Sequence, residues 1–427
     1  MNCEQAKALD RADELKASRA EFALPRDRHG SEFIYLCGHS LGLAPLAARA
    51  RVLEELDDWQ RLGVHGHEHA RRAWISYAEQ LAPQLAVLTG AQTHEVVAMN
   101  SLSINLHLLL ASFYRPTAAR HRILIEAGAF PSDRHIVASQ IRWQGFDPAT
   151  SLVELAPRPD AELLRAEDID ACIDREGDAL ALVLWPGVQY RTGQAFNARE
   201  IVRSAQRAGA QVGFDLAHAI GNLPLSLHDS GADFAAWCSY KYLNGGPGAI
   251  GGAFVHERHA CNAQLPRLAG WWGSDPATRF RMSEEFELTS GAAGWQVSNP
   301  PILSAAPLFA SLARFVEAGP ARLRAKSIRL TAFLADALRA RCGTDIDIIT
   351  PADPEQRGCQ LSIRVRGGSE RARHVHAAFG ERGVVSDWRE PDTIRLAPVP
   401  LYNTFLDAWR AAELLAEILG VAQAEPK

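Results

Sequence analysis

The sequence predicts an α/β protein whose larger part is a mainly parallel, doubly wound sheet, followed by a smaller α+β domain. Short apolar runs alternate with segments of helical periodicity through the middle of the chain, which is typical of parallel strands joined by crossover helices. Two runs, Gln211–Phe214 and Asp233–Cys238, lack polar–apolar alternation and therefore indicate strands buried on both faces. The composition shifts toward the end of the chain, where a shorter block of strands and helices indicates the second domain.

The composition is that of a globular protein with a sizeable core. Of the 427 residues, 47% are hydrophobic and 22% are charged, and this length predicts about two or three domains. The net charge of −5 argues against a nucleic-acid partner and against binding to an anionic membrane surface.

The cysteine pattern, together with the lack of a signal-peptide region or a membrane-spanning apolar run, predicts a cytoplasmic protein. The seven cysteines are odd in number, scattered and without CxxC spacing, which is typical of free thiols in a reducing compartment. The first residues carry no signal-peptide hydrophobic region, and no apolar run approaches the ~18 residues of a membrane span.

The first part of the chain is expected to consist of helices, with one tight turn between the first helix and the second. We expect a polar helix over residues 3–20, a short strand and turn over Phe33–Pro45, and helices over Leu46–Leu62 and Trp74–Leu88. The predicted organisation is an N-terminal segment, 1–60, that packs on the small domain, a large domain, 61–310, and a small C-terminal domain, 311–427.

The βα rhythm defines the remaining elements. In the large domain we expect further strands over Val96–Met99, Arg122–Glu126, Ser151–Leu155, Ala179–Trp185 and Ala249–His256, and helices over Ile104–Tyr114, Asp133–Gln144, Ala166–Arg175 and Ala198–Ala208. Two helices, Ile302–Ala318 and Gly319–Arg341, then lead to the small domain, with strands Gln360–Val365 and Thr393–Leu396 and helices Glu370–Gly380 and Asn403–Leu419.

An acid and a lysine follow the two central strands. Asp215 closes the first strand, with His218 three residues later, and Lys241 follows the second strand directly after Tyr240. Open α/β sheets bind ligands at the carboxyl ends of neighbouring strands. A lysine and an acid in this position meet the needs of pyridoxal 5′-phosphate (PLP), because the lysine forms a Schiff base and the acid keeps the pyridine nitrogen protonated. Taken singly, a surface lysine and a helix N-cap are the simpler interpretations.

Two helix starts provide further candidate cofactor contacts. Asn100-Ser-Leu-Ser103 precedes an apolar helix, and a serine-bearing N-cap there would leave free N–H groups for a phosphate. In Phe130-Pro-Ser-Asp133, the aromatic ring is placed to stack on a cofactor, while Ser132 and Asp133 cap the helix. A hydrophobic residue that simply precedes a helix explains Phe130 equally well.

Histidine-rich segments raise the alternative of a metal site. His65, His67, Glu68 and His69 lie close together, yet neither they nor His256-Glu-Arg-His259 has the HExxH spacing of a helical zinc site. We therefore predict no metal and treat His67 as a candidate pocket residue. The glycines after Lys241 lead into a strand rather than a helix, which excludes a dinucleotide-binding loop.

Arg395, at the end of the last predicted strand, is a candidate carboxylate-binding residue. If this strand terminus faces the large domain, its guanidinium can hold a carboxylate through two hydrogen bonds. A surface ion pair is the alternative interpretation of an isolated arginine.

Taken together, these features resemble the fold-type I PLP-dependent enzymes, and local sequence strings narrow the resemblance to the kynureninase family. The matching strings, in order, are LCGHSLGLAP, GHE, FPSD, DLAHAIGN, SYKYLNGGPGAIGGAFVHERH, GWWG, SNPPIL and RLAPVPLYN. They span residues 30 to 420, and their common order is far more specific than any single motif.

The resemblance implies a role for each matching residue. Lys241, Tyr240 and Asp215 would be catalytic: Lys241 carries PLP, Asp215 contacts the pyridine nitrogen and Tyr240 donates a proton. The implied cofactor contacts are Leu102, Ser103, Phe130, Pro131, Ser132, Asp133, Asp215, His218, Tyr240, Lys241, Trp271 and Asn299, of which Trp271 and Asn299 come from the second subunit of a homodimer with shared active sites. The implied substrate contacts are Arg395, for the α-carboxylate, and His67, Ser298 and Asn299, around the aromatic end. One departure is Pro186, which stands where some relatives have a small hydroxyl residue.

The implied reaction is the PLP-dependent hydrolysis of L-kynurenine, and of its 3-hydroxy form, to anthranilate or 3-hydroxyanthranilate and L-alanine. This reaction belongs to tryptophan catabolism through the kynurenine pathway, which also feeds NAD biosynthesis. Another enzyme of the same fold, such as a cysteine desulfurase, would need a mobile loop cysteine, whereas Cys238 and Cys261 lie in strand or strand-end contexts. A metal-dependent hydrolase is a second alternative, and a non-enzymatic descendant would be expected to have lost Lys241 or Arg395.

Overall fold

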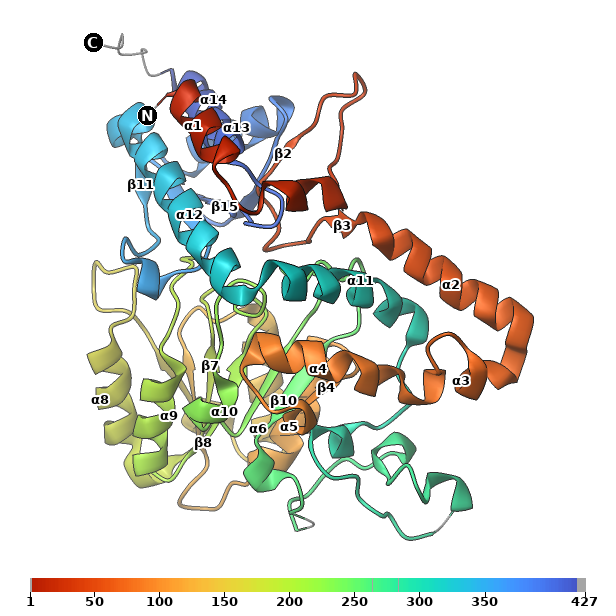
Figure 1. Ribbon diagram of the computed structural model, residues 1–427. Helices are drawn as coiled ribbons and strands as arrows, with labels where there is room; N and C mark the ends of the chain where they lie inside the picture. Colours follow the sequence, from red (N-terminus) through yellow and green to blue (C-terminus); the bar gives the residue numbers. More distant parts are fainter. Residues whose placement is uncertain (1, 263, 283, 421–427) are drawn as a thin grey trace.

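A seven-stranded sheet forms the centre of the computed structural model, which describes residues 2–262, 264–282 and 284–420 (Figure 1). The strand order is β4-β10-β9-β8-β7-β5-β6, and only β10 among them runs antiparallel to its neighbours. The strands are β4 (Val96–Ala98), β5 (Arg122–Glu126), β6 (Leu152–Leu155), β7 (Leu180–Pro186), β8 (Gln211–Asp215), β9 (Phe234–Trp237) and β10 (Gly252–Val255). The predicted mainly parallel, doubly wound sheet is confirmed.

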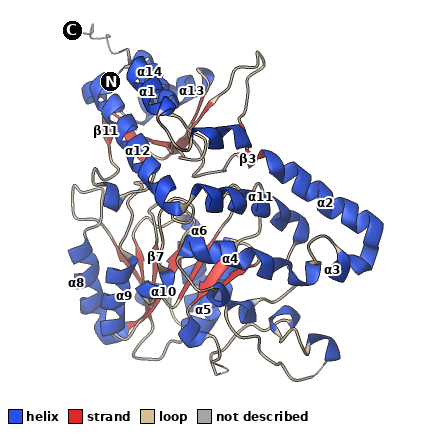
Figure 2. Ribbon diagram, viewed as in Figure 1, coloured by secondary structure: helices blue, strands red, loops and turns tan. Residues whose placement is uncertain are grey.

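Helices cover both faces of this sheet, as Figure 2 shows. One face packs on α4 (Tyr77–Thr89), α8 (Ala166–Glu176), α9 (Ala198–Arg207), α10 (Leu227–Ser230) and α11 (Ile302–Ala318), and the other on α5 (Leu102–Phe113) and α6 (Pro131–Trp143). Successive residues of a strand serve opposite faces: Leu124 joins the first core, whereas Ile123 and Ile125 join the second. Continuous apolar strands are therefore required, which explains why polar–apolar alternation is absent from the sequence.

The C-terminal part has its own antiparallel sheet and hydrophobic core. Its strand order is β11-β12-β15-β14. The strands are β11 (Ile346–Ile348), β12 (Leu361–Val365), β15 (Thr393–Leu396) and β14 (Asp387–Arg389), and the helices are α12 (Pro320–Cys342), α13 (Ser369–Glu381) and α14 (Phe405–Leu419). The sequence predicted the two central strands but not the edge strands β11 and β14, which have only three residues each.

The N-terminal residues are fastened to the C-terminal helices. Asp10 accepts hydrogen bonds from the first two N–H groups of α14, at 2.7 and 3.0 Å, and the buried Asp13 carboxylate lies 2.7 Å from Lys326 on α12. The helix predicted over residues 3–20 is wrong in extent, because α1 (Cys3–Arg11) ends before a separate 3₁₀ turn, Lys16–Glu21. The boundaries proposed between the three parts stay predictions.

The remaining elements are short, apart from one long helix. Strand β1 (Phe22–Ala23) pairs with β3 (Ala44–Pro45), and β2 (Ile34–Tyr35) pairs with β13 (Val384–Val385). Helix α2 (Leu46–Leu62) lies against α11, and α3 (Gly66–His69) and α7 (Pro148–Ser151) are single turns.

No single helix of the described residues has both the length and the apolar character needed to cross a membrane. Residues 302–318 and 320–345 meet those criteria only as a pair, and their axes are bent by 82°.

Gly213 in β8 tests how tightly the central strands are packed. A Cβ atom at this position would overlap the ring of Phe234, a fully buried residue of β9. We expect Gly213→Ala to lower the free energy of unfolding by about 1–3 kcal/mol, the usual cost of overpacking a core, as measured by urea denaturation. Gly380→Ala in α13 is the matched control, because its Cβ would meet open space. If both variants are equally stable, the strands are looser than the structure indicates.

Candidate active site

A cavity of about 160 Å³ lies at the carboxyl ends of the central strands. Its wall is built from the ends of β5, β7 and β8, the loop after β9 and the first turns of α5 and α6. It brings together nine of the predicted site residues: Leu102, Ser103, Phe130, Ser132, Asp133, Asp215, His218, Tyr240 and Lys241. Pro186 also lines it, at the end of β7. Because the strands pair in parallel, their last residues lie together at one edge of the sheet, as the sequence predicted.

Lys241 lies in the middle of this cavity. Its Nζ is 3.1 Å from His218 Nε2 and 5.8 Å from the centroid of the Phe130 ring. Burial, with Lys241 as the next cause, lowers the pKa of His218 well below its ordinary value, so the imidazole is neutral and accepts a hydrogen bond from the lysine. Asp215 ends β8, and its Oδ1 accepts the N–H of Ala217 at 2.7 Å. The turn that follows β8 therefore sets both the acid and the histidine in place.

The N-terminus of α5 offers an anion site on the other side of the cavity. Ser101 occupies the N-cap position, so the predicted serine-bearing N-cap is confirmed, and its side chain makes no capping hydrogen bond to a described residue. Ser101, Leu102 and Ser103 line the cavity, so the free N–H groups at the positive end of this helix dipole can bind an anion there. Ser103 Oγ lies 2.9 Å from Ser132 Oγ, which joins this turn to the start of α6.

The capping predicted at the start of α6 is wrong. The N-cap residue is Phe130, and Ser132 and Asp133 lie within the first turn without capping hydrogen bonds. Because α6 already starts at Pro131, both side chains are free to face the cavity instead.

Two buried carboxyl groups accompany Asp215, and one of them was missed in the sequence. Burial raises the pKa of Glu126, the last residue of β5, to about 8. Burial, followed by the nearby Asp215 carboxylate, raises the pKa of Asp133 well above its usual range. Glu126 closes its strand as Asp215 closes β8, so the same signal, an acid at the end of an apolar run, would have identified it.

Arg395 lies inside β15 and not at the strand terminus. It is fully buried; its Nε donates to Asp387 Oδ1 at 3.0 Å and its Nη1 donates to the carbonyl oxygen of Tyr190 at 2.6 Å. Its Nη2 lies 2.7 Å from the same Asp387 oxygen but makes no hydrogen bond within the described residues. Tyr190 in turn lines the cavity, and its ring contacts Phe130 edge-on at 5.3 Å. The guanidinium therefore contacts the cavity wall from behind, through the carbonyl oxygen of Tyr190.

The other predicted residues lie outside the cavity. His67 is exposed on α3, where its ring packs against Trp74. Ser298 and Asn299 are exposed in a loop, and Trp271 is half exposed with its Nε1 donating to the carbonyl oxygen of Arg279. Pro131 is the first residue of α6 and does not line the cavity.

The residues of the cavity fit PLP. A lysine amine, a carboxylate on the adjacent strand, an aromatic ring and a helix N-terminus are the groups that its aldehyde, ring nitrogen, ring face and phosphate need. The buried Oδ1 of Asp133 and Nδ1 of His218, both without a partner among the described residues, leave further hydrogen-bonding capacity for a polar ligand.

Solved structures define the class of the fold. A cysteine desulfurase from Escherichia coli superposes with a TM-score of 0.75 at 17% identity, covering 96% of this chain and 99% of that one. A mutant of C-DES with glycine covalently linked to its PLP cofactor superposes with a TM-score of 0.73 at 19% identity, covering 92% and 99% of the two chains. The fold is that of the fold-type I PLP-dependent enzymes.

Sequence relatives define the family within this class. A kynureninase from Xanthomonas oryzae pv. oryzae is 58% identical over 422 residues, which cover 95% of this chain and 98% of the relative. A kynureninase from Xanthomonas campestris pv. campestris is 56% identical over 408 residues, with 96% of both chains covered. The family model described as the kynureninase C-terminal domain matches residues 323–415. The chain belongs to the kynureninase family.

The pH dependence of stability tests the environment of Glu126. In the folded chain this carboxyl keeps its proton up to a pKa of about 8, whereas its ordinary pKa is 4.5, so unfolding releases a proton between these values and stability falls as the pH rises through this window. We expect Glu126→Gln to match the parent protein near pH 4.5 and to become progressively more stable by a few kcal/mol up to pH 8. Urea denaturation of the apoprotein across this range measures the difference. Glu14→Gln, which changes an exposed carboxylate, should show no such trend; a flat difference for Glu126→Gln would contradict the buried carboxyl.

Proposed function

We propose that this protein is a PLP-dependent hydrolase that cleaves L-kynurenine to anthranilate and L-alanine, and also cleaves 3-hydroxy-L-kynurenine to 3-hydroxyanthranilate and L-alanine. The observation that carries the proposal is that Lys241 and Asp215 follow adjacent parallel strands and face one cavity. The proposed place of the reaction is tryptophan catabolism, including supply to NAD biosynthesis, in the cytoplasm.

PLP supplies an electron sink that makes the bonds around the substrate α-carbon and β-carbon labile. Lys241 binds the cofactor aldehyde and, once released by substrate, moves the α-proton. Because His218 is neutral, it accepts a hydrogen bond from the lysine amine and does not compete with it for the positive charge. The Asp215 carboxylate is held by a backbone N–H at a strand end, where it balances a protonated pyridine nitrogen.

Tyr240 is proposed to donate a proton when the β–γ carbon bond breaks. Burial, followed by the neighbouring Cys238, raises the pKa of its phenol above the ordinary value, so the hydroxyl stays protonated and can act as a donor. Ser103 and the N–H groups of the α5 N-terminus are proposed to hold the cofactor phosphate, and Phe130 to stack on its ring. Arg395 is proposed to bind the substrate α-carboxylate.

A cysteine desulfurase activity is not supported by the thiols in this region. Cys238 lines the cavity, but burial raises the pKa of its thiol to about 11, so it is not a thiolate nucleophile at neutral pH. Cys261 is exposed and lies outside the cavity lining.

We further propose a homodimer in which each cavity is completed by the second subunit. Trp271 and Asn299 are exposed in their own chain, and a Cβ atom at Gly270 would overlap the backbone of Val297, so the loops that carry these two residues pack against each other. Exposed apolar side chains at Phe280 and Met282 extend this surface. A two-fold axis then places the same surface of each subunit over the cavity of the other.

Substitution of Lys241 tests the proposed reaction. The parent protein should show visible absorption from bound PLP and should release fluorescent anthranilate from kynurenine, whereas Lys241→Ala should lose this activity. Because Lys241 lies in a loop after a strand, the midpoint temperature of thermal unfolding of the Lys241→Ala variant should change little. Lys7→Ala, at an exposed helix position, is the control. Persistent cleavage in Lys241→Ala would contradict the proposal.

Refolding of two inactive variants together tests the shared site. Lys241→Ala and Asn299→Ala subunits pair at random, so half of the dimers are mixed and about a quarter of all sites regain both native residues. We expect about a quarter of parent activity in the kynurenine assay. Asn299→Ala must first prove strongly impaired alone. No recovery in a mixture with demonstrated heterodimers would show that each chain builds its own site.

A further inference from the structure

His39 is a fully buried histidine whose two ring nitrogens both lack a hydrogen-bond partner among the described residues. It lies in the loop 37–42, between β2 and β3. Buried polar groups are nearly always paired, because an unpaired donor or acceptor loses its hydration without compensation. A histidine with both nitrogens unpaired therefore needs an explanation from its surroundings.

The loop of His39 is fixed in position from both sides. The N–H of Gly42 donates to the carbonyl oxygen of Tyr240 at 2.8 Å, which joins the loop to the segment of Lys241. Cys37 forms a parallel bridge with Ala397, directly after β15. At Gly38 a Cβ atom would overlap the Tyr402 hydroxyl, so the backbone approaches as closely as a glycine permits. Mobility of the loop does not explain the unpaired ring.

Further unpaired nitrogens lie around this ring. The centroid of the His218 ring is 6.2 Å from that of His39; the buried Nδ1 of His218 has no partner among the described residues, while its Nε2 lies 3.1 Å from Lys241. Arg395, whose positive charge acts on both histidines, has an Nη2 that makes no hydrogen bond to a described residue. Three separate elements thus each contribute a buried nitrogen with hydrogen-bonding capacity to the same region beside the cavity.

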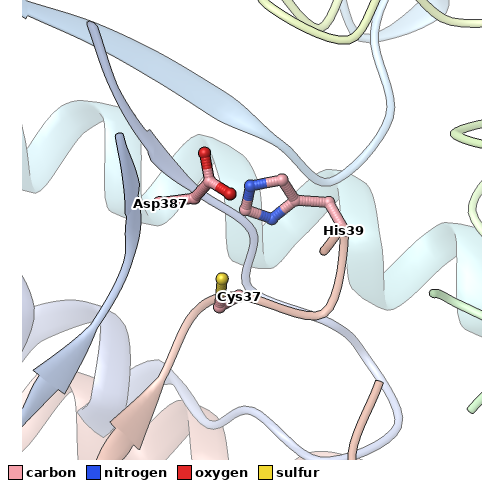
Figure 3. Close-up of side chains that lie close together, drawn as sticks. All are labelled: Cys37, His39 and Asp387. Atoms are coloured by element: carbon pink, nitrogen blue, oxygen red, sulfur yellow. The ribbon is translucent and has the colours of Figure 1, made fainter. Parts of the chain in front are cut away.

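A metal ion is disfavoured as the missing partner, although His39, Cys37 and Asp387 lie close together (Figure 3). Asp387 already accepts hydrogen bonds from the guanidinium groups of Arg395 and Arg389. The positive charges of Arg395, Lys241 and Arg389 also act on His39. These charges repel a divalent cation and attract an anion with acceptor oxygens.

We propose that His39 is a substrate-binding residue that donates a hydrogen bond to the α-carboxylate of the bound amino acid, beside Arg395. This inference rests on the proposed function. A neutral imidazole adds a donor to the carboxylate site without adding a second charge to the Arg395–Asp387 pair. Because His39 and Arg395 are fully buried, the carboxylate reaches them only when the wall residues shift aside.

The test compares two small ligands that differ only in the carboxylate, L-alanine and ethylamine, with absorption of the bound cofactor as the binding signal. In the holoenzyme we expect His39→Leu to weaken L-alanine binding about tenfold to a hundredfold, since one hydrogen bond to a charged group is lost. Ethylamine binding should stay within about twofold, and KM for kynurenine should rise more than kcat falls. His39→Asn, which keeps a donor, should recover part of the affinity and guards against misfolding of the leucine variant.

Two further variants make each outcome decisive. His121→Leu is the matched control, because His121 is bonded to Ser151 at the opposite end of β5 and should leave both affinities unchanged. Equal weakening of L-alanine and ethylamine by His39→Leu, or no weakening of either, overturns the inference. Arg395→Gln separates this inference from the proposed function. If Arg395→Gln loses L-alanine binding while His39→Leu binds L-alanine fully, only the role of His39 is overturned. If His39→Leu loses L-alanine binding while Arg395→Gln binds it fully, only the role of Arg395 is overturned.

Discussion

Parallel hydrogen bonding between β8 and β9 holds Asp215 and the chain leading to Lys241 at the same edge of the sheet, with Asp215 opposite Ala236 in the register. The pairing is tight, because Gly213 leaves room for the Phe234 ring and no more. The next two strands in the sheet each add one wall residue at the same edge: Pro186 from β7, which lies opposite Asp215, and Glu126 from β5. The chemistry of the cavity therefore depends on strand register, and a slip of one residue would turn these side chains to the other face.

Burial then decides which of the gathered groups carry charge. It raises the pKa of Glu126 to about 8 and lowers those of His39 and His218, so all three groups are neutral at pH 7. These three side chains therefore add no charge of their own to this buried region. A neutral His218 beside Lys241 accepts a hydrogen bond where a charged one would repel the amine. Interactions between the charges that remain in this buried region are therefore stronger than they would be in water.

The sequence predicted most of the sheet and the centre of the site, because both follow from local patterns. Apolar runs marked the strands, and the acid and lysine that follow two of them marked Asp215 and Lys241. Helix capping by Ser132 and Asp133 failed because these side chains face a cavity, which no local pattern encodes. The edge strands β11 (IDI) and β14 (DWR) contain charged residues and therefore do not form the apolar runs that marked the other strands, including the equally short β4 (VVA). The exposed positions of Trp271 and Asn299 were equally beyond local patterns, because they depend on loop packing.

The hydrogen-bonded loop 37–42 connects the cavity at the large sheet to the small C-terminal sheet, so residues from both sheets can belong to one site. At one end of the loop, the N–H of Gly42 donates a hydrogen bond to the carbonyl oxygen of Tyr240. At the other end, Cys37 forms a β-bridge with Ala397, which directly follows the strand β15 that carries Arg395. The Tyr190 carbonyl makes a second link, from the cavity wall to Arg395 Nη1. Two independent connections therefore fix the arginine relative to Lys241. For the proposed substrate, held by its amino group near Lys241 and by its α-carboxylate at Arg395, any shift of the small sheet would change the distance between these two contacts.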